Sequence, residues 1–159
     1  MVGFGYDSHK LVDGKPLLLG GIRIESDKGA LAHSDGDVVL HSLCDSMLGA
    51  SGLGDIGELF PDDDIQYKGA DSSIFVSEIL KMLHERSLIV NNVDITILLE
   101  KPKLKSYKES IRNNISKLIK IPVERINIKA KTNEGMGFIG KMEGIACYCI
   151  CEIQKKASD

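Results

Sequence analysis

The chain has 159 residues, of which 43% are hydrophobic and 27% charged, and its formal net charge is −3. This length and composition predict a single globular domain over residues 1–159. A small negative charge argues against nucleic acid or an anionic membrane as a partner, because both are bound by concentrated positive charge. The chain has no apolar run of about 18 residues that could cross a membrane and no secretory signal at its start, so a cytoplasmic protein is expected.

The order of hydrophobic patterns predicts an α+β fold with helices packed on one face of a sheet. Strands are expected at 2–6, in a bent pair within 17–25, and at 93–99, 126–130 and 145–153. Helices are expected at 37–48, from 71 or 72 to about 86, and up to 119 behind a capping box at 106–109. Residues 49–71 are rich in glycine and acidic residues and are expected to form a long functional connection.

Asp7, His9 and His41 form a candidate metal site. Asp7 and His9 are two residues apart on an extended segment that follows the expected strand at 2–6, so their side chains point to the same face, while His41 lies on an expected helix. Two histidines and one carboxylate leave one position of a tetrahedral Zn²⁺ ion open, as catalytic zinc sites do. Asp37 and Asp45 lie one turn on either side of His41, and each either orients the imidazole or is a solvated helix residue.

Two other segments have features suited to phosphate. His33 and Ser34 precede an expected helix, where free backbone N–H groups attract phosphate and Ser34 is a candidate N-cap. Thr132 and Asn133 follow an expected strand, and a threonine hydroxyl with nearby backbone amides suits phosphate oxygens. Glu134 suits a hard ion such as Mg²⁺, and an exposed glutamate in an ordinary turn is the alternative.

Three cysteines, Cys147, Cys149 and Cys151, alternate along the last expected strand. Their sulfur atoms therefore share one face. They are either thiolate ligands of a metal or small apolar side chains on a core or interface face. The second interpretation is favoured, because neighbours on one extended strand do not easily surround a single tetrahedral ion.

Six segments occur in the order found in one enzyme family: 3–9 (GFGYDSH), 32–41 (AHSDGDVVLH), 52–57 (GLGDIG), 60–64 (FPDDD), 67–72 (YKGADS) and 132–140 (TNEGMGFIG). On these motifs, which span nearly the whole chain, it resembles the 2-C-methyl-D-erythritol 2,4-cyclodiphosphate synthases of the non-mevalonate isoprenoid pathway. The resemblance implies a lyase that acts on 4-diphosphocytidyl-2-C-methyl-D-erythritol 2-phosphate. The 2-phosphate would attack the β-phosphorus of the diphosphate, and CMP would leave.

The resemblance also implies roles for individual residues. It implies Zn²⁺ on Asp7, His9 and His41, and Mg²⁺ or Mn²⁺ on Glu134. It implies that His33 and Thr132 polarise phosphates in the transition state. The remaining substrate contacts that it implies are Ser34, Asp55, Ile56, Gly57, Phe60, Asp62, Asp64, Asn133, Phe138 and Lys141, with cytosine held, largely through backbone groups, by the segment that contains Leu99, Pro102, Lys103, Leu104 and Lys105.

Members of this family have a ferredoxin-like protomer and form homotrimers with active sites between subunits. The resemblance therefore implies a cytidine pocket on a neighbouring chain, and it offers the trimer axis as the position of the cysteine face. Lys141 replaces an arginine that is common in the family. Because lysine lacks the planar fork that grips phosphate in two places, isoprenoid diphosphates are expected to bind the central cavity weakly.

Two other functions are the alternatives to this interpretation. In a zinc phosphohydrolase, water rather than the internal phosphate would attack, and the product would be linear. In a noncatalytic nucleotide-binding or assembly module, the ligand set would be incomplete, whereas here all three zinc ligands are present in the sequence.

Overall fold

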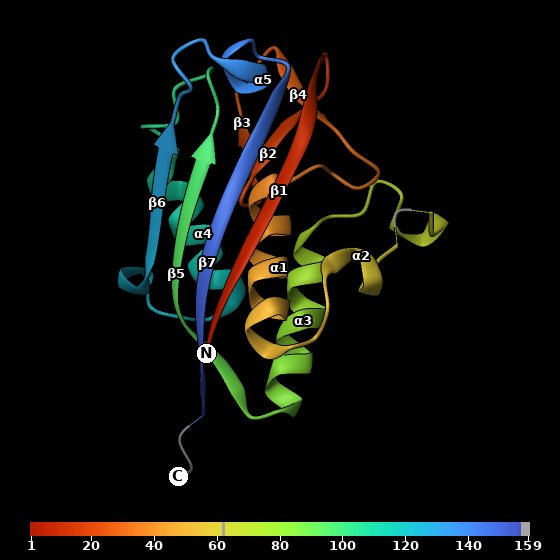
Figure 1. Ribbon diagram of the computed structural model, residues 1–159, viewed down its shortest axis with the longest axis vertical. Helices are drawn as coiled ribbons and strands as arrows, with labels where there is room; N and C mark the ends of the chain where they lie inside the picture. The colour runs from red at the N-terminus through yellow and green to blue at the C-terminus, as the bar shows by residue number, and fades with distance from the viewer. Residues whose placement is uncertain (62, 157–159) are drawn as a thin grey trace.

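The computed structural model describes residues 1–61 and 63–156. In this part of the chain, five strands form one mixed sheet in the order β4-β1-β7-β5-β6 (Figure 1). The bounds are Lys28–Leu31 for β4, Val2–Asp13 for β1, Gly144–Lys155 for β7, Leu88–Leu98 for β5 and Ile126–Lys131 for β6. Neighbouring strands are antiparallel except β5 and β6, which run parallel. The predicted bent pair is a hairpin of β2 (Leu17–Leu19) and β3 (Ile22–Ile24).

The long helices pack on one face of the sheet, as predicted (Figure 1). Helix α1 packs on β1 and β7, α3 on α1 and β5, and α4 on β6. Their bounds are Val38–Ser51 for α1, Ser73–Glu85 for α3 and Lys108–Ile119 for α4. Shorter elements lie in the connections: α2 (Ile56–Leu59), η1 (Ile65–Tyr67), η2 (Val123–Arg125) and α5 (Gly137–Gly140).

Among the described residues, no helix combines the length and apolar character needed to cross a membrane.

Helix α1 lies close to β1 because two glycines face it. A Cβ atom on Gly3 would lie 2.0 Å from the carbonyl oxygen of Ser46, and one on Gly5 would lie 1.9 Å from that of Ser42. Any larger residue would force the helix away from the strand. The close approach allows a side chain of α1, that of His41, to reach Asp7 on the same face of β1.

The cysteines of β7 belong to the core beneath α1. Ser42 Oγ donates to Cys147 Sγ at 3.1 Å, Ser46 Oγ donates to Cys149 Sγ at 3.2 Å, and all the thiols of β7 are buried. Their interpretation as small core side chains is confirmed. The expectation that they face a trimer axis is wrong, because α1 covers their side of the sheet. The uncovered side of β1 and β7 carries an exposed apolar patch, the sheet-face patch, formed by Val2, Phe4, Tyr6, Tyr148 and Ile150.

Several elements differ from their predicted extent. Strand β1 continues beyond 2–6 to Asp13, and β5 begins at Leu88, before the predicted 93–99. Both are extended by pairing with β7, β1 along residues 144–152 and β5 along residues 146–155. Strand β4 was not predicted, since four residues are too few to show an alternating pattern. The connection at 49–71 contains α2 and η1. The predicted capping box does not form, because α4 begins after Tyr107 without a side-chain cap.

The ferredoxin-like arrangement implied by the resemblance is not found. That arrangement joins its second and third strands directly, in the order β-α-β-β-α-β. Here α4 lies between β5 and β6, whereas only the short α5 segment separates β6 from β7. A helical crossover allows two neighbouring strands to run parallel, so the sheet is mixed.

Candidate metal centre

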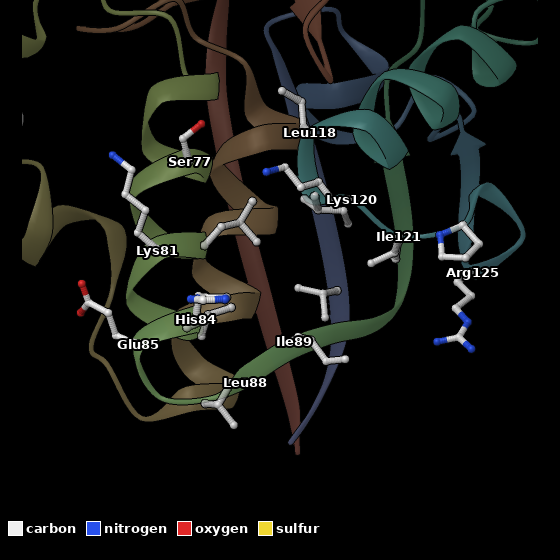
Figure 2. A pocket seen from close by; sticks show the side chains of 15 residues that line it. Ser77, Lys81, His84, Glu85, Leu88, Ile89, Leu118, Lys120, Ile121 and Arg125 are labelled. Carbon is white, nitrogen blue, oxygen red and sulfur yellow. The ribbon is translucent and has the colours of Figure 1, made fainter. Parts of the chain in front are cut away.

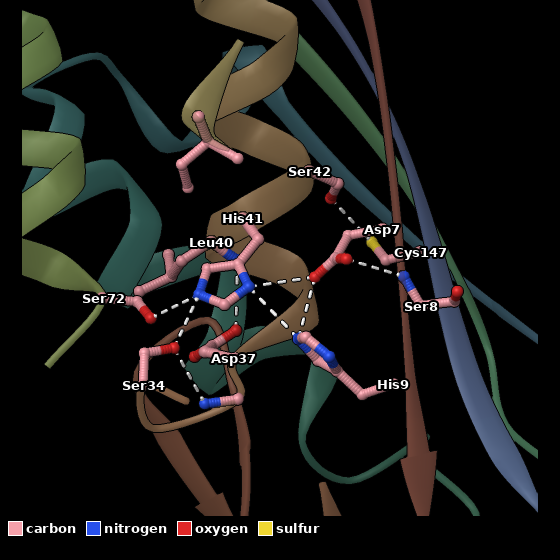
Figure 3. Close-up of polar contacts among 12 residues, drawn as sticks. Asp7, Ser8, His9, Ser34, Asp37, Leu40, His41, Ser42, Ser72 and Cys147 are labelled. Atoms are coloured by element: carbon pink, nitrogen blue, oxygen red, sulfur yellow. Dashed lines mark hydrogen bonds and ion pairs between the residues drawn. The ribbon is translucent and has the colours of Figure 1, made fainter. Parts of the chain in front are cut away.

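Asp7, His9 and His41 converge on one point (Figure 3). The Oδ2 atom of Asp7 lies 2.9 Å from His9 Nε2 and 2.9 Å from His41 Nδ1. The two ring nitrogens lie 3.2 Å apart. Donor atoms around a tetrahedral Zn²⁺ ion with bonds of about 2.0 Å are separated by roughly 3.3 Å. The residues therefore fit such an ion, and the predicted cluster is present, while the identity of the metal stays a prediction.

Two elements position these three side chains. Asp7, His9 and the buried glycines of β1 share the face that α1 covers, because side chains alternate along a strand. His41 lies in the first turns of α1 and is almost completely buried. The second carboxylate oxygen of Asp7 accepts the backbone N–H of Ser8 at 2.8 Å, which fixes the orientation of the carboxylate.

The cluster stabilises opposite charges on Asp7 and His41. Burial alone would raise the pKa of Asp7, but hydrogen bonds with His41 and His9, together with their charges, lower it to about 2. Burial alone would lower the pKa of His41, but the hydrogen bond to Asp7 and the charges of Asp7, Asp37 and Asp35 raise it. A dication would take the place of the protons that these groups share, because metal ligands bind in their deprotonated forms.

Asp37, rather than Ser34, caps α1. Its buried carboxylate accepts hydrogen bonds of 2.6–3.1 Å from the backbone N–H groups of Gly20, Gly21, Val39 and Leu40. Burial raises the pKa of Asp37 despite these bonds. Both interpretations of Asp37 from the sequence are wrong, because its carboxylate joins the β2–β3 hairpin to the helix and neither orients the imidazole nor lies in solvent.

Asp45 joins α1 to the segment expected to contact ribose. It lies one turn after His41, and its Oδ1 atom accepts the backbone N–H of Ile56 at 2.9 Å. Asp55 caps α2, and both Asp55 and Gly57 are exposed. Asp45 therefore positions the start of α2 instead of orienting the imidazole, and burial raises its pKa.

Two serines contact the outer nitrogen of His41, and one of them, Ser72, was not predicted to belong to this site. His41 Nε2 lies 2.8 Å from Ser72 Oγ and 3.2 Å from Ser34 Oγ (Figure 3). Ser72 is 31 residues away from His41 in the chain. Its position at the start of an expected helix favours a capping role, and its position at the end of the 67–72 motif does not by itself indicate a contact with His41.

His33 is bound to the long connection before α3. Its Nε2 atom donates to the backbone carbonyl of Asp64 at 3.2 Å, and Gly69 N donates to the carbonyl of His33 at 2.8 Å. The side chain of Asp64 caps η1 by accepting the backbone N–H of Gln66 at 3.0 Å. Two predicted substrate residues, His33 and Asp64, are thus brought together. Asp62 lies outside the described residues.

Phe60 lies in an aromatic cluster beside the metal centre. Its ring centroid is 4.7 Å from that of Phe75 and 5.5 Å from that of Tyr67. The ring of Phe75 is in turn 6.2 Å from the imidazole of His41. Phe60 is therefore partly committed to packing, and its expected contact with substrate stays a prediction.

Thr132, Asn133 and Glu134 lie in the turn between β6 and α5. The backbone N–H of Asn133 donates to the Glu100 carboxylate at 3.0 Å, which ties this turn to the residues after β5. Glu134 is exposed and has a positive φ of 52°. It is therefore available to solvent ions, although its backbone conformation is one that residues other than glycine rarely adopt.

Helix α5 carries the predicted residues Phe138 and Lys141 towards the start of β7. A Cβ on Gly144 would lie 2.6 Å from the Phe138 ring, so the ring packs directly on this glycine. Gly144 pairs with Lys10, the residue after His9. Phe138 therefore lies near the His9 end of β1, and Lys141 is the exposed C-cap of α5.

The segment expected to hold cytosine follows β5. Leu99 and Leu104 are buried in the core, whereas Lys103 and Lys105 are exposed and Pro102 is half-buried. Because the two leucine side chains are buried, the backbone groups and the exposed lysines of this segment are the groups available to a ligand. Strand β7 separates β5 from β1 in the sheet, and Figure 1 shows the connection after β5 beside that after β6. One copy of the chain thus holds this segment apart from the metal ligands.

A pocket of about 780 Å³ lies elsewhere, between the C-terminal parts of α3 and α4 and the start of β5 (Figure 2). Apolar side chains such as Leu88 and Ile121 line it, and Lys81, Glu85 and Arg125 lie around it. It contains none of the residues expected in the site, and its lining on α3 runs from Ser77 to Glu85, beyond Ser72. The candidate metal centre therefore lies outside this pocket.

The fold and the cluster define an α+β protein with a candidate metal site of two histidines and one aspartate. The sequence profile of the YgbB family matches residues 1–154, and the chain belongs to this family. A curated relative, the 2-C-methyl-D-erythritol 2,4-cyclodiphosphate synthase of Clostridium botulinum (strain Alaska E43 / Type E3), is 50% identical over 155 residues, which cover 98% of this chain and 99% of the relative. The family resemblance inferred from the sequence is therefore confirmed, and the chain is an enzyme of this family.

Solved structures agree with this assignment. A structure of 2C-methyl-D-erythritol-2,4-cyclodiphosphate synthase is 38% identical, has a TM-score of 0.90, and is matched over 97% of this chain and 100% of its own. A structure of the same synthase in a CDP-bound form is 36% identical and has a TM-score of 0.90, again over 97% of this chain and 100% of its own. At these identities, the similarity extends beyond the fold to the family.

Proposed function

We propose that this chain is a CMP-releasing cyclodiphosphate synthase, a phosphorus–oxygen lyase. Its substrate is 4-diphosphocytidyl-2-C-methyl-D-erythritol 2-phosphate, and its products are 2-C-methyl-D-erythritol 2,4-cyclodiphosphate and CMP. One observation carries the proposal: Asp7, His9 and His41 converge on one point in a chain whose curated relative is named as this synthase.

This reaction depends on positioning and charge stabilisation more than on a strong base. The attacking 2-phosphate is already an anion, so no protein group has to remove a proton from it. A bond forms between a 2-phosphate oxygen and the β-phosphorus, and the bond from the β-phosphorus to the bridging oxygen breaks, so that CMP keeps this oxygen. The barrier lies in bringing charged phosphates together in line.

Asp7, His9 and His41 would hold Zn²⁺, and Glu134 would hold Mg²⁺ or Mn²⁺. When bound, such ions supply Lewis-acid stabilisation of phosphate charge worth several kcal/mol. Three protein ligands at the first site leave a fourth position for a phosphate oxygen. The exposure of Glu134 suits an ion that keeps several waters and is bound mainly through substrate phosphates.

The other residues bind and orient the substrate. His33 and Thr132 donate hydrogen bonds to phosphate oxygens as charge develops on them. Ser34 and Asp62 contact the erythritol phosphate and hydroxyls, and Asp55 and Gly57 contact the ribose. Further contacts come from Ile56, Phe60, Asp64, Asn133, Phe138 and Lys141. His33 exchanges its hydrogen bond with the Asp64 carbonyl for one with phosphate. This exchange couples the second part of the long connection, residues 60–71 (the 60–71 connection), to the arrival of substrate.

Cytosine is held by Leu99, Pro102, Lys103, Leu104 and Lys105 of a neighbouring copy in a homotrimer with active sites between subunits. Three observations support this part of the proposal. Strand β7 separates this segment from the metal ligands within one chain. A solved relative is described in a CDP-bound form. The rings of Tyr6, Tyr148 and Phe4 lie 5.0–6.0 Å apart on the exposed sheet-face patch, and exposed apolar patches mark interaction sites.

The test is an incubation of the purified protein with the diphosphocytidyl methylerythritol 2-phosphate, Zn²⁺ and Mg²⁺, followed by phosphorus NMR. CMP together with a cyclic diphosphate is the expected result. CMP with a linear product would replace the proposal with the zinc phosphohydrolase. The absence of CMP from a protein that carries stoichiometric zinc would indicate a site that binds nucleotide without catalysis.

A further inference from the structure

The imidazole of His41 lies between two sets of polar groups. Its Nδ1 atom faces Asp7 and His9, and its Nε2 atom faces Ser72 at 2.8 Å (Figure 3). A nitrogen that binds a metal must present its lone pair, so the other nitrogen must carry the hydrogen and needs an acceptor. The acceptor beside Nε2 therefore decides how well Nδ1 is prepared for a metal.

Ser72 is placed to be that acceptor. It is fully buried and is the N-cap residue of α3, yet its hydroxyl makes no capping hydrogen bond. The hydroxyl instead donates to Asp35 Oδ1. Since its single hydrogen is committed to Asp35, its oxygen presents lone pairs to His41 Nε2.

Asp35 is itself held in place by the backbone. Its Oδ2 accepts the N–H of Ser72 at 2.9 Å, and its Oδ1 accepts the N–H of Asp37 at 3.1 Å. The N–H of Asp35 donates to the carbonyl of Ala70 at 3.0 Å. These bonds fix the loop before α1 to the residues before α3, so the carboxylate has one orientation relative to Ser72.

Ser34 is a weaker partner of the same nitrogen. Its hydroxyl lies 3.2 Å from His41 Nε2, and its oxygen accepts the N–H of Gly36 at 3.4 Å. Neither contact fixes the direction of its hydrogen. Ser72 differs from Ser34 because its hydroxyl donates to the carboxylate of Asp35.

We infer that Ser72 and Asp35 are positioning residues for the metal ligand His41. A chain of hydrogen bonds runs from His41 Nε2–H to Ser72 Oγ and from Ser72 Oγ–H to the Asp35 carboxylate, and it aims the Nδ1 lone pair at the metal position. This inference deepens the proposed function, since it concerns the same metal site. It also joins the end of the 60–71 connection to a metal ligand, because Ser72 directly follows that connection.

The test uses the full chain with Zn²⁺ alone and has two readouts. The first is the proton NMR signal of His41 Nε2–H in ¹⁵N-histidine-labelled protein, recorded without metal at pH 6 and again with zinc. A hydrogen bond to Ser72 protects this proton from exchange with water in both forms, because imidazolium and metal-bound imidazole both carry it. The second readout is the zinc dissociation constant, measured by competition with a chelator.

In wild type we expect a slowly exchanging Nε2–H signal. Ser72→Ala is expected to lose this protection and to weaken zinc binding by about 10–100-fold, the usual effect of removing the partner of a metal-binding histidine. Asp35→Asn is expected to change both readouts in the same direction by a smaller factor, since an amide can still accept one hydrogen bond. Ser73→Ala, the same chemical change one residue later, is expected to change neither. Circular dichroism checks that each variant is folded.

Wild-type exchange and wild-type zinc affinity in folded Ser72→Ala would overturn the inference. An unchanged Asp35→Asn beside an altered Ser72→Ala would remove Asp35 from it. If the wild type bound no zinc at all, the proposed function would fail, whereas the Nε2–H signal in the metal-free protein would still test the contact between His41 and Ser72.

Discussion

The two candidate metal positions differ in the number of ligands that one copy of the chain brings together at each. Asp7, His9 and His41 come from a strand and a helix that pack closely, and their donor atoms already face one point. Glu134 stands on an exposed turn, and among the described residues it belongs to no second cluster of three ligands. A preformed site can hold its ion before substrate arrives, whereas a single carboxylate depends on the phosphates of the substrate.

The largest effect is expected from removing a ligand of the preformed site. His41→Ala deletes one of three ligands and one of the two imidazole partners of the Asp7 carboxylate. Zinc content and turnover should both collapse, with turnover falling by about a thousandfold or more. Metal analysis and phosphorus NMR measure the two quantities. His84→Ala, which changes an exposed histidine at the far end of α3, should keep both. Full turnover in His41→Ala would refute the zinc assignment.

Removing the charge of Glu134 should lower the activity without changing the zinc content. Glu134→Gln keeps the shape of the side chain and removes its charge, so we expect turnover to fall by about 100-fold and to respond to higher Mg²⁺ concentrations, while zinc content stays stoichiometric. Initial rates across a Mg²⁺ titration measure this effect. Glu143→Gln is the matched control. A loss of zinc in Glu134→Gln would mean that the two positions are not independent.

A third change tests whether the chain needs a neighbour to complete its site. Tyr148→Asp places a charge in the centre of the sheet-face patch and should weaken self-association roughly thirtyfold or more, because buried aromatic residues dominate interface energies. Light scattering after gel filtration should show a smaller species that keeps its zinc but has lost activity. Ile74→Asp, an exposed apolar residue on α3, should leave the assembly unchanged. Full activity in a monomeric Tyr148→Asp would exclude shared active sites.

The ion pair of the preformed site should appear in the pH dependence of stability without metal. Asp7 has its pKa lowered from 3.8 to about 2, so its contribution of about 2 kcal/mol is present above pH 4 and is lost as the pH falls from about 4 to about 2. His41 has its pKa raised, so its contribution is complete below its usual pKa of about 6.5 and is lost at higher pH. Urea unfolding in the presence of a chelator from pH 2 to 8 measures both changes in the free energy of unfolding. Asp7→Asn should reduce both changes.

The smallest effect is expected at the buried cysteines. Burial raises the pKa of Cys147 and Cys151 to about 12, and it raises those of Cys44 and Cys149 as well. Because the thiolate is the reactive form, iodoacetamide at pH 8 should modify none of the four in the folded protein and all of them after unfolding. Mass spectrometry counts the adducts. Rapid native modification of Cys147 or Cys149, with no loss of activity, would contradict their place beneath α1.

Patterns within single elements were predicted well. The alternation at 2–6 gave the direction of Asp7 and His9, and the apolar spacing of 37–48 gave the helix that carries His41. The family motifs added predicted roles for residues that no periodicity distinguishes, such as His33 and Thr132, and these roles stay predictions. The strand order and the parallel pair of β5 and β6 were not predicted, since they depend on how α4 crosses the sheet.

The sequence by itself determined the class of fold, the three residues of the candidate metal site and the family, because these depend on residue type and on spacing within an element. Only the tertiary structure decided which polar groups serve those ligands. Asp37, the N-cap of α1, also accepts a hydrogen bond from a hairpin residue 17 positions earlier, and Ser72 reaches His41 across 31 residues. The cysteines likewise face α1 because Gly3 and Gly5 admit the helix. Periodicity fixes the side of an element on which a residue lies, whereas its partner depends on which other element packs against that side.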